Sequence, residues 1–272
     1  MALHEHSISG NGAGLGGAAH RVDILGVGVS AVNMEQALQK LVQHIEAGER
    51  GYVCVTDVNA LLHASRDPEL CNIFNRSTMT VPDGVPLVWA GRSAGAEWMD
   101  RVCGPDLMPA LLSVAAEQKW SSYFLGGAPS VAEEMIESFK RTIPDLQIAG
   151  WQSPPFRELS CQEETAMVQE INDSGAQIVW VGLGAPKQER WMDQYRSKLT
   201  ASLLVGVGGA FDMHAGRVRR APRWMQRSGL EWAFRLAQEP VRLSGRYSRT
   251  IPAFALGMLR HAPRLVIGRE QP

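Results

Sequence analysis

The chain has 272 residues, of which 45% are hydrophobic and 20% charged, as expected of a folded protein with one large domain, or one domain with an appendage. No run reaches about 18 uninterrupted apolar residues and residues 1–20 lack an apolar core, so neither a membrane span nor a signal peptide is expected. The four cysteines form no closely spaced pair, which excludes a zinc-type cluster and favours reduced thiols in the cytoplasm.

Charge is distributed unevenly along the chain. The net charge is −1, but the segment from Arg217 onward contains 12 arginines, no lysine and three acids, giving +9 against −10 for the residues before it. We therefore divide the chain into a disordered tail (1–20), a core (21–216) and a basic appendage (217–272). The appendage is expected to meet phosphates or an anionic membrane surface, since arginine binds phosphate bidentately. The alternative is that these arginines are ordinary solvated side chains that form ion pairs on the surface of the protein. Nucleic acid is not expected, because no recognised binding module is present.

Strands and helices alternate through the core. In chain order, the strands are expected at 22–27, 52–55, 79–81, 122–125, 147–150, 177–181 and 203–207. Helices are expected at 33–47, from Leu61 to about Asn75, and at 106–119, 130–141 and 163–173. This order predicts an α/β fold, with a Rossmann-like, mostly parallel sheet and helices on both faces.

Polar residues and glycines gather just after the expected strands. They are Thr56, Asp57, Asn59, Asp83, Gly126, Gly127, Lys187, Gln188 and Asp212. The carboxyl ends of parallel strands share one edge of a sheet, and open α/β sheets bind ligands there. These residues are therefore expected to line one crevice.

The segment from Gly182 to Trp191 indicates a binding site most strongly. Its Gly-x-Gly-x-Pro sequence follows a buried strand and is followed by Lys187, Gln188 and Glu189. The glycines allow the backbone to approach a ligand closely, and the proline prepares the start of a helix.

A rival interpretation starts at Gly26-Val27-Gly28-Val29-Ser30-Ala31. This segment approximates a dinucleotide fingerprint, and Asp57 follows the next strand, as in a nicotinamide-dependent oxidoreductase. The expected helix cap at Asn33 lies too far along the chain for a pyrophosphate at the helix start.

Asp83 stands in a rigid turn between Pro82 and Gly84. An aspartate there either shapes the turn or caps a helix, or it serves as the general base that deprotonates a hydroxyl nucleophile. Arg101 could hold a phosphate or pair with a nearby acid. The sequence has no cluster of metal ligands, so arginines and backbone N–H groups would have to neutralise a diphosphate leaving group.

A series of segments spans about residues 22–249. It consists of Val81-Pro82-Asp83-Gly84, Arg101-Val102-Cys103-Gly104-Pro105-Asp106-Leu107, Leu125-Gly126-Gly127, Val181-Gly182-Leu183-Gly184-Ala185-Pro186-Lys187-Gln188-Glu189, Gly206-Val207-Gly208-Gly209-Ala210-Phe211-Asp212, Ala215-Gly216, Arg220-Ala221-Pro222-Arg223-Trp224 and the segment from Gly229 to Pro240. This series resembles the WecG/TagA/CpsF family of bacterial glycosyltransferases, glycosyltransferase family 26.

The resemblance implies an inverting, metal-independent transferase without a cofactor. It would move a sugar from a UDP-sugar to a polyprenyl-diphosphate-linked saccharide at the cytoplasmic face of the cell membrane. Asp83 matches the proposed base, Arg101 and Gln188 match pocket residues, and Asp212 matches a position near the nucleotide. The appendage is expected to close over the site and to supply arginines. These are Arg235, Arg242 and Arg246.

The resemblance also carries a departure. Many members have Thr-x-Asn after the second strand, whereas this chain has Thr56-Asp57-Val58-Asn59, so either Thr56 or Asp57 could take the threonine's place. Other segments resemble an exopolysaccharide-associated branch, which leaves the donor open between a hexose and an N-acetylhexosamine. Homo-oligomerisation also stays open. The basic tail is expected to lie on an anionic membrane surface rather than to span the membrane. Pro252 and Pro263 are expected to interrupt it, so that no single continuous helix forms.

Overall fold

The computed structural model describes residues 20–267, apart from the side chains of Arg242 and Ile267. The disordered tail expected over residues 1–20 therefore lies almost wholly outside the described residues.

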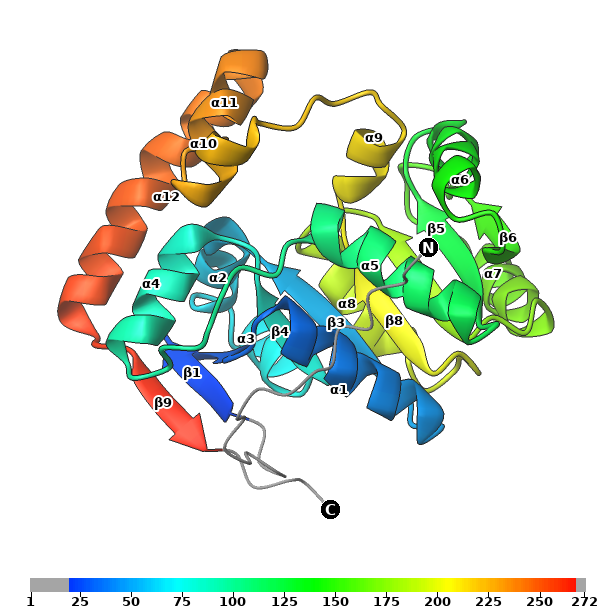
Figure 1. Ribbon diagram of the computed structural model, residues 1–272, viewed down its shortest axis with the longest axis horizontal. Helices are drawn as coiled ribbons and strands as arrows, with labels where there is room; N and C mark the ends of the chain where they lie inside the picture. The colour runs from blue at the N-terminus through cyan, green and yellow to red at the C-terminus, as the bar shows by residue number, and fades with distance from the viewer. Residues whose placement is uncertain (1–19, 268–272) are drawn as a thin grey trace, which may run out of the picture.

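A six-stranded parallel sheet forms the centre of the molecule, with the strand order β4-β3-β8-β7-β5-β6 (Figure 1). Its strands are β3 (Gly51–Thr56), β4 (Met79–Pro82), β5 (Ser121–Gly126), β6 (Gln147–Gln152), β7 (Ile178–Gly182) and β8 (Leu203–Gly206). All of these strands were expected. The α/β fold with a parallel sheet is thus confirmed.

Helices cover both faces of the sheet and bury two separate cores. One face carries α1 (Met34–Glu46), α5 (Gly104–Glu117), α6 (Val131–Thr142) and α9 (Ala210–His214). The other carries α2 (Val58–Ala64), α3 (Pro68–Asn75), α4 (Val85–Ser93), α7 (Cys161–Asp173) and α8 (Lys187–Tyr195). Side chains alternate along β3, so Tyr52 and Cys54 join one core while Val53 and Val55 join the other. Burial on both sides explains the run of apolar residues from Tyr52 to Val55.

The expected strand over 22–27 is wrong. The chain reverses there, joining β1 (His20–Ile24) to β2 (Val27–Ser30) in an antiparallel hairpin. Leu25 and Gly26 form the two-residue turn with φ values of 55° and 88°, the positive region that such hairpins require. Gly26 therefore does not lead from a parallel strand into a helix, and the nicotinamide-binding interpretation loses its structural basis.

Two further differences involve prolines. The helix expected to run to Asn75 is divided, because Pro68 disfavours helical geometry at Asp67, which instead caps α3. The helix α4 was not expected, since Gly84 and Pro86 indicated a turn. Here Pro86 occupies the first turn of the helix, where its missing N–H costs nothing.

Within residues 217–267, the basic appendage forms three helices and a strand. These are α10 (Arg223–Arg227), α11 (Glu231–Gln238), α12 (Pro240–Arg260) and β9 (Arg264–Ile267). The expected interruption at Pro252 is wrong, because α12 continues through it. Pro252 lies on the exposed side of the helix, where water can satisfy the carbonyl group that loses its partner.

The C-terminal segment also returns to the start of the described chain. Helix α12 packs against α2 and α11, and β9 pairs with β1 to complete a sheet of order β2-β1-β9 (Figure 1). Within residues 20–267, no helix has both the length and the apolar character needed to cross a membrane.

Candidate active site

Asp83 lies at the carboxyl end of β4, at the edge where polar residues were expected to converge. Its backbone N–H donates to the carbonyl of Thr56 on the neighbouring strand at 2.9 Å. Arg101 holds it from the other side: Nε donates to the Asp83 carbonyl at 2.6 Å and Nη2 to its Oδ1 at 3.2 Å. The carboxyl group is therefore fixed in place while 28% of its side chain stays exposed.

Glu231 completes this cluster from the appendage. Its Oε2 accepts a hydrogen bond of 2.6 Å from the same Arg101 Nη2 that contacts Asp83. Its Oε1 lies 3.8 Å from Nε of Arg220. One guanidinium thus joins the sheet edge to α11. Glu231 was not among the predicted site residues, although it is one of only three acids in the arginine-rich segment.

The electrostatic setting of Asp83 suits a base. Burial raises the pKa of Asp83 to about 6; Arg101 opposes this shift, while the carboxylates of Asp57 and Glu231 add to it. At neutral pH most Asp83 side chains are ionised, yet their proton affinity exceeds that of an ordinary aspartate. A base with a pKa just below the working pH combines availability with strength.

Asp57 connects α2 to α12. One carboxylate oxygen caps α2 by accepting from the Ala60 N–H at 2.7 Å, and the other pairs with Arg246 of α12. One turn further along α12, the Thr250 hydroxyl donates to the side-chain oxygen of Asn59, in the first turn of α2, at 3.3 Å. These contacts place α12 beside the carboxyl end of β3.

Aromatic and cationic groups of the appendage also lie near the carboxyl end of β3. The Arg246 guanidinium carbon is 6.0 Å from the centre of the Tyr247 ring, and that ring meets Trp232 edge-on at 5.7 Å. Arg235 extends from α11 to the loop after β8, where its Nη2 is 3.6 Å from the position that a Cβ on Gly209 would occupy. The appendage therefore reaches two strand ends.

The three polar residues that follow β7 differ in their exposure to solvent. Lys187 is exposed at the start of α8, whereas Gln188 and Glu189 are buried. Gln188 accepts from the Gly184 N–H at 3.2 Å and donates to Glu189 at 3.0 Å. Burial raises the pKa of Glu189 to about 7, and its Oε2 has no hydrogen-bond partner among the described residues.

Glycines bring the neighbouring turns close together. Gly127 donates its N–H to the Gly182 carbonyl at 3.1 Å, and a Cβ on Gly126 would lie 2.6 Å from that same carbonyl group. Gly126 also has a φ of 120°, which side chains disfavour. These glycines therefore let the turns after β5 and β7 pack directly against each other.

The remaining predicted residues have different environments. Thr56 is fully buried and its hydroxyl donates to the Cys54 carbonyl at 3.3 Å, so Asp57 is the member of that pair that faces the appendage. Asp212 is half-buried in the first turn of α9. The Arg242 side chain lies outside the described part of the structure.

Asp83, Arg101, Asp57 and Arg246 thus lie together at the carboxyl ends of β3 and β4, on one side of the sheet edge. Glu231, which was not predicted, belongs to the same group. Gly126 and Gly127 lie four strands away from β4, or roughly 20 Å at about 4.8 Å per strand.

A cavity of about 450 Å³ opens beside the Asp83–Arg101 pair. Five arginines line it, together with the exposed Trp89 of α4: Arg92, Arg101, Arg220, Arg223 and Arg227. Three of them are paired with acids, whereas Arg223 and Arg227 have no ion pair within residues 20–267. Over the same residues, no group of three or more His, Cys, Asp or Glu side chains could hold a metal ion.

Comparison with known proteins gives a consistent result. Two curated relatives bear the name N-acetylglucosaminyldiphosphoundecaprenol N-acetyl-beta-D-mannosaminyltransferase. The protein from Bacillus spizizenii is 30% identical over 233 residues, covering 84% of this chain and 88% of its own length. That from Bacillus subtilis is 30% identical over 197 residues, covering 72% and 74%. Residues 22–266 match the family described as "Glycosyl transferase WecG/TagA/CpsF family". The expected resemblance is confirmed, and the chain belongs to this family of glycosyltransferases.

Proposed function

We propose that the protein is an inverting, metal-independent transferase that moves a hexose or N-acetylhexosamine from a UDP-sugar to a polyprenyl-diphosphate-linked saccharide. Its product would serve bacterial cell-surface or exopolysaccharide synthesis. The observation that carries the proposal is the Asp83 carboxylate, fixed at the sheet edge by Arg101 and given a raised pKa. The names of the two relatives favour N-acetylmannosamine as the sugar and an undecaprenyl-diphosphate acceptor.

The chemistry follows from the position of this carboxylate. The acceptor hydroxyl would donate its proton to Asp83 as its oxygen attacks the anomeric carbon of the donor. The bond from that carbon to the diphosphate would break in line with the attack, which inverts the anomeric centre. Asp83 would then hold the proton, and UDP would leave with the electron pair. General-base help of this kind typically contributes about 100- to 10,000-fold.

Positive charge and backbone groups would stabilise the departing UDP. Arg101 lies beside Asp83, while Arg235 and Arg246 approach from the appendage. The glycine turns after β5 and β7, with Lys187 and Asp212, supply a path along the edge for the nucleotide. Fixed cationic groups in a partly water-excluded cleft act strongly on developing charge.

The arginine-lined cavity is a suitable place for the acceptor diphosphate. It adjoins Arg101, and Arg223 and Arg227 have no ion pair in the described part of the chain. The exposed Trp89 and the half-buried Val85 supply apolar surface at the same cavity, which suits the start of a polyprenyl chain. The basic appendage over 217–272 would close this site and contact the inner face of the cell membrane peripherally.

A donor panel with a short-chain polyprenyl-diphosphate saccharide tests this proposal. Transfer from one UDP-sugar, unchanged by a chelator, is the expected result. Failure of every UDP-sugar, or complete loss of transfer with the chelator, would contradict it. Binding of NAD(H) would instead support the interpretation of the protein as a nicotinamide-dependent oxidoreductase.

A further inference from the structure

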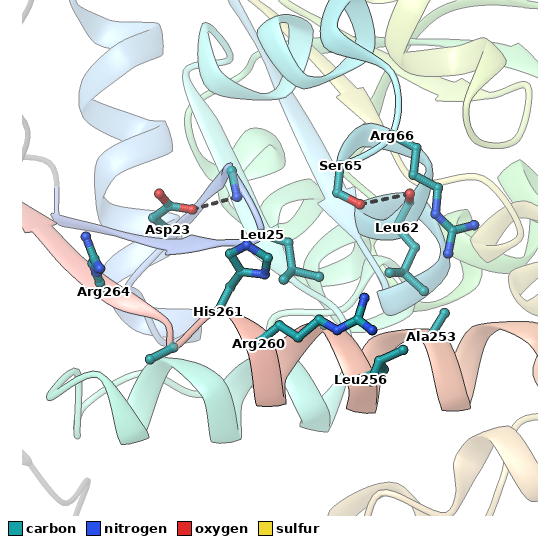
Figure 2. A pocket seen from close by; sticks show the side chains of 13 residues that line it. Asp23, Leu25, Leu62, Ser65, Arg66, Ala253, Leu256, Arg260, His261 and Arg264 are labelled. Carbon is teal, nitrogen blue, oxygen red and sulfur yellow. Dashed lines mark hydrogen bonds between the residues drawn. The ribbon is translucent and has the colours of Figure 1, made fainter.

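A second cavity lies away from the Asp83 cleft, where the β1–β2 turn, the end of α2, the end of α12 and the start of β9 meet (Figure 2). Its volume is about 780 Å³, within the range of small-molecule sites. None of the predicted site residues lines it.

Unpaired positive charge surrounds this cavity. Arg66, Arg260 and Arg264 line it, all three are exposed, and none has an ion pair within residues 20–267. In Figure 2, Arg66 extends from the end of α2 and Arg260 from α12 toward the same opening, with Arg264 at the other end. The lining acid, Asp23, accepts a hydrogen bond from the Gly26 N–H at 2.7 Å. Three arginines against one aspartate give the lining a net charge of +2, which favours an anion from outside the chain.

Apolar side chains form much of the remaining wall, which also includes Ser65 and His261. Leu62 of α2, Leu256 of α12 and Leu25 of the hairpin turn all line the cavity. Leu256 is 47% exposed and the nearby Leu259 is 85% exposed. A ligand that suits this wall has an apolar part beside its anionic group.

Leu25, one of the lining residues, has a backbone conformation that is unfavourable for its residue type. Its φ of 55° is disfavoured for leucine, and such turns usually take asparagine or glycine at this position. Its side chain instead meets α12, where a Cβ on Gly257 would lie only 2.9 Å from Leu25 Cδ1. Strained residues persist where the surrounding structure uses their side chains.

We infer that this cavity binds the phosphate headgroup of a membrane phospholipid, with Arg66 and Arg260 holding the phosphate and the three leucines facing the acyl chains. This inference rests on the proposed function and specifies how the appendage would contact the membrane. A polyprenyl-diphosphate acceptor fits poorly, because its reacting hydroxyl must reach Asp83. Arg260 is 14 residues from Arg246 along α12, or about 21 Å at 1.5 Å per residue.

The test uses the full chain and dihexanoylphosphatidylglycerol below its micelle concentration, with binding measured by titration calorimetry. A monomeric lipid offers no charged surface, so only a defined site can bind it. We expect one lipid per chain. The substitutions Arg66→Gln and Arg260→Gln should each weaken binding about tenfold or more, as for a lost hydrogen bond between charged groups.

Arg249→Gln is the matched control, since Arg249 is exposed on the same helix, has no ion pair in the described structure and lies outside the cavity. It should bind the lipid like the wild type. Equal losses for Arg249→Gln and Arg260→Gln, no binding by the wild type, competition by UDP, or preferential displacement by a short-chain polyprenyl diphosphate would each overturn the inference.

Two further measurements separate this site from the transferase activity. Thermal unfolding of Arg66→Gln and Arg260→Gln should match the wild type, because these exposed arginines make no ion pair within residues 20–267. Sugar transfer to a soluble short-chain acceptor should also be unchanged in both variants. A wild-type chain that binds the lipid without transferring any sugar would refute the proposed function and leave the lipid site intact.

Discussion

Replacing Glu231 with glutamine should strengthen the acidic character of Asp83. Both carboxylates contact the same Arg101 nitrogen, at 2.6 and 3.2 Å, so their oxygens are at most about 6 Å apart. At that separation two unit charges repel by about 3 kcal/mol with an effective dielectric constant of about 20. Asp83 is 28% exposed, and solvent therefore reduces this repulsion to about 1–2 kcal/mol.

A repulsion of that size corresponds to about one pH unit. In the wild type, kcat/KM should rise as Asp83 loses its proton near pH 6. In Glu231→Gln the same acid limb should lie about one pH unit lower, because the ionised form of Asp83 no longer faces Glu231. Glutamine retains an oxygen that can accept from Arg101, so the contact between α11 and the sheet edge is preserved.

The assay is initial-rate transfer to a short-chain acceptor across the pH range, with the UDP-sugar well below KM. Glu97→Gln is a suitable control, since Glu97 is exposed, lines neither cavity, and has no ion pair or side-chain hydrogen bond within residues 20–267. An acid limb that stays in place in Glu231→Gln would refute the electrostatic coupling of Glu231 to Asp83. An equal shift in Glu97→Gln would assign the effect to general surface charge instead.

Three further predictions concern stability, each measured by urea unfolding. Asp57→Ala should cost about 1 kcal/mol because it removes the cap of α2, whereas Asp57→Asn should cost less; equal losses would contradict the capping role. Gly126→Ala should destabilise more than Gly48→Ala, since both have positive φ but only the former clashes with backbone. Burial raises the pKa of Glu189 to about 7. The protonated side chain therefore makes its full contribution to the free energy of unfolding below about pH 4.5, and this contribution is lost as pH rises through 7. Glu189→Gln should remove that decline, up to about 3 kcal/mol, and an unchanged slope would contradict it.

The sequence predicts the sheet well because its strands are buried on both faces. Near-continuous apolar runs such as the one from Tyr52 to Val55 have few other uses, and alternation with amphipathic helices indicates parallel pairing. Local pattern does not separate the hairpin at Leu25-Gly26 from a strand followed by a loop. Leucine rarely occupies a positive φ, so the usual sequence indication of such a turn is missing.

The candidate site was predictable where strand ends converge. The positions of Asp83, Asp57 and Gly126 follow from the rule that parallel strands end at one edge. Glu231 does not follow from that rule, because it comes from a helix whose placement depends on tertiary contacts with Arg101 and Arg220. The continuity of α12 through Pro252 likewise depends on which side of the helix faces solvent.

The turnover of Asp83→Asn tests the role of this carboxylate most directly. Asparagine keeps the shape of the side chain and an oxygen for Arg101, but it cannot take the proton of the acceptor hydroxyl. We predict that kcat falls by about 100- to 10,000-fold while UDP binds almost as tightly as to the wild type. Near-wild-type turnover by Asp83→Asn, with the variant folded and UDP bound, would contradict Asp83 as the base.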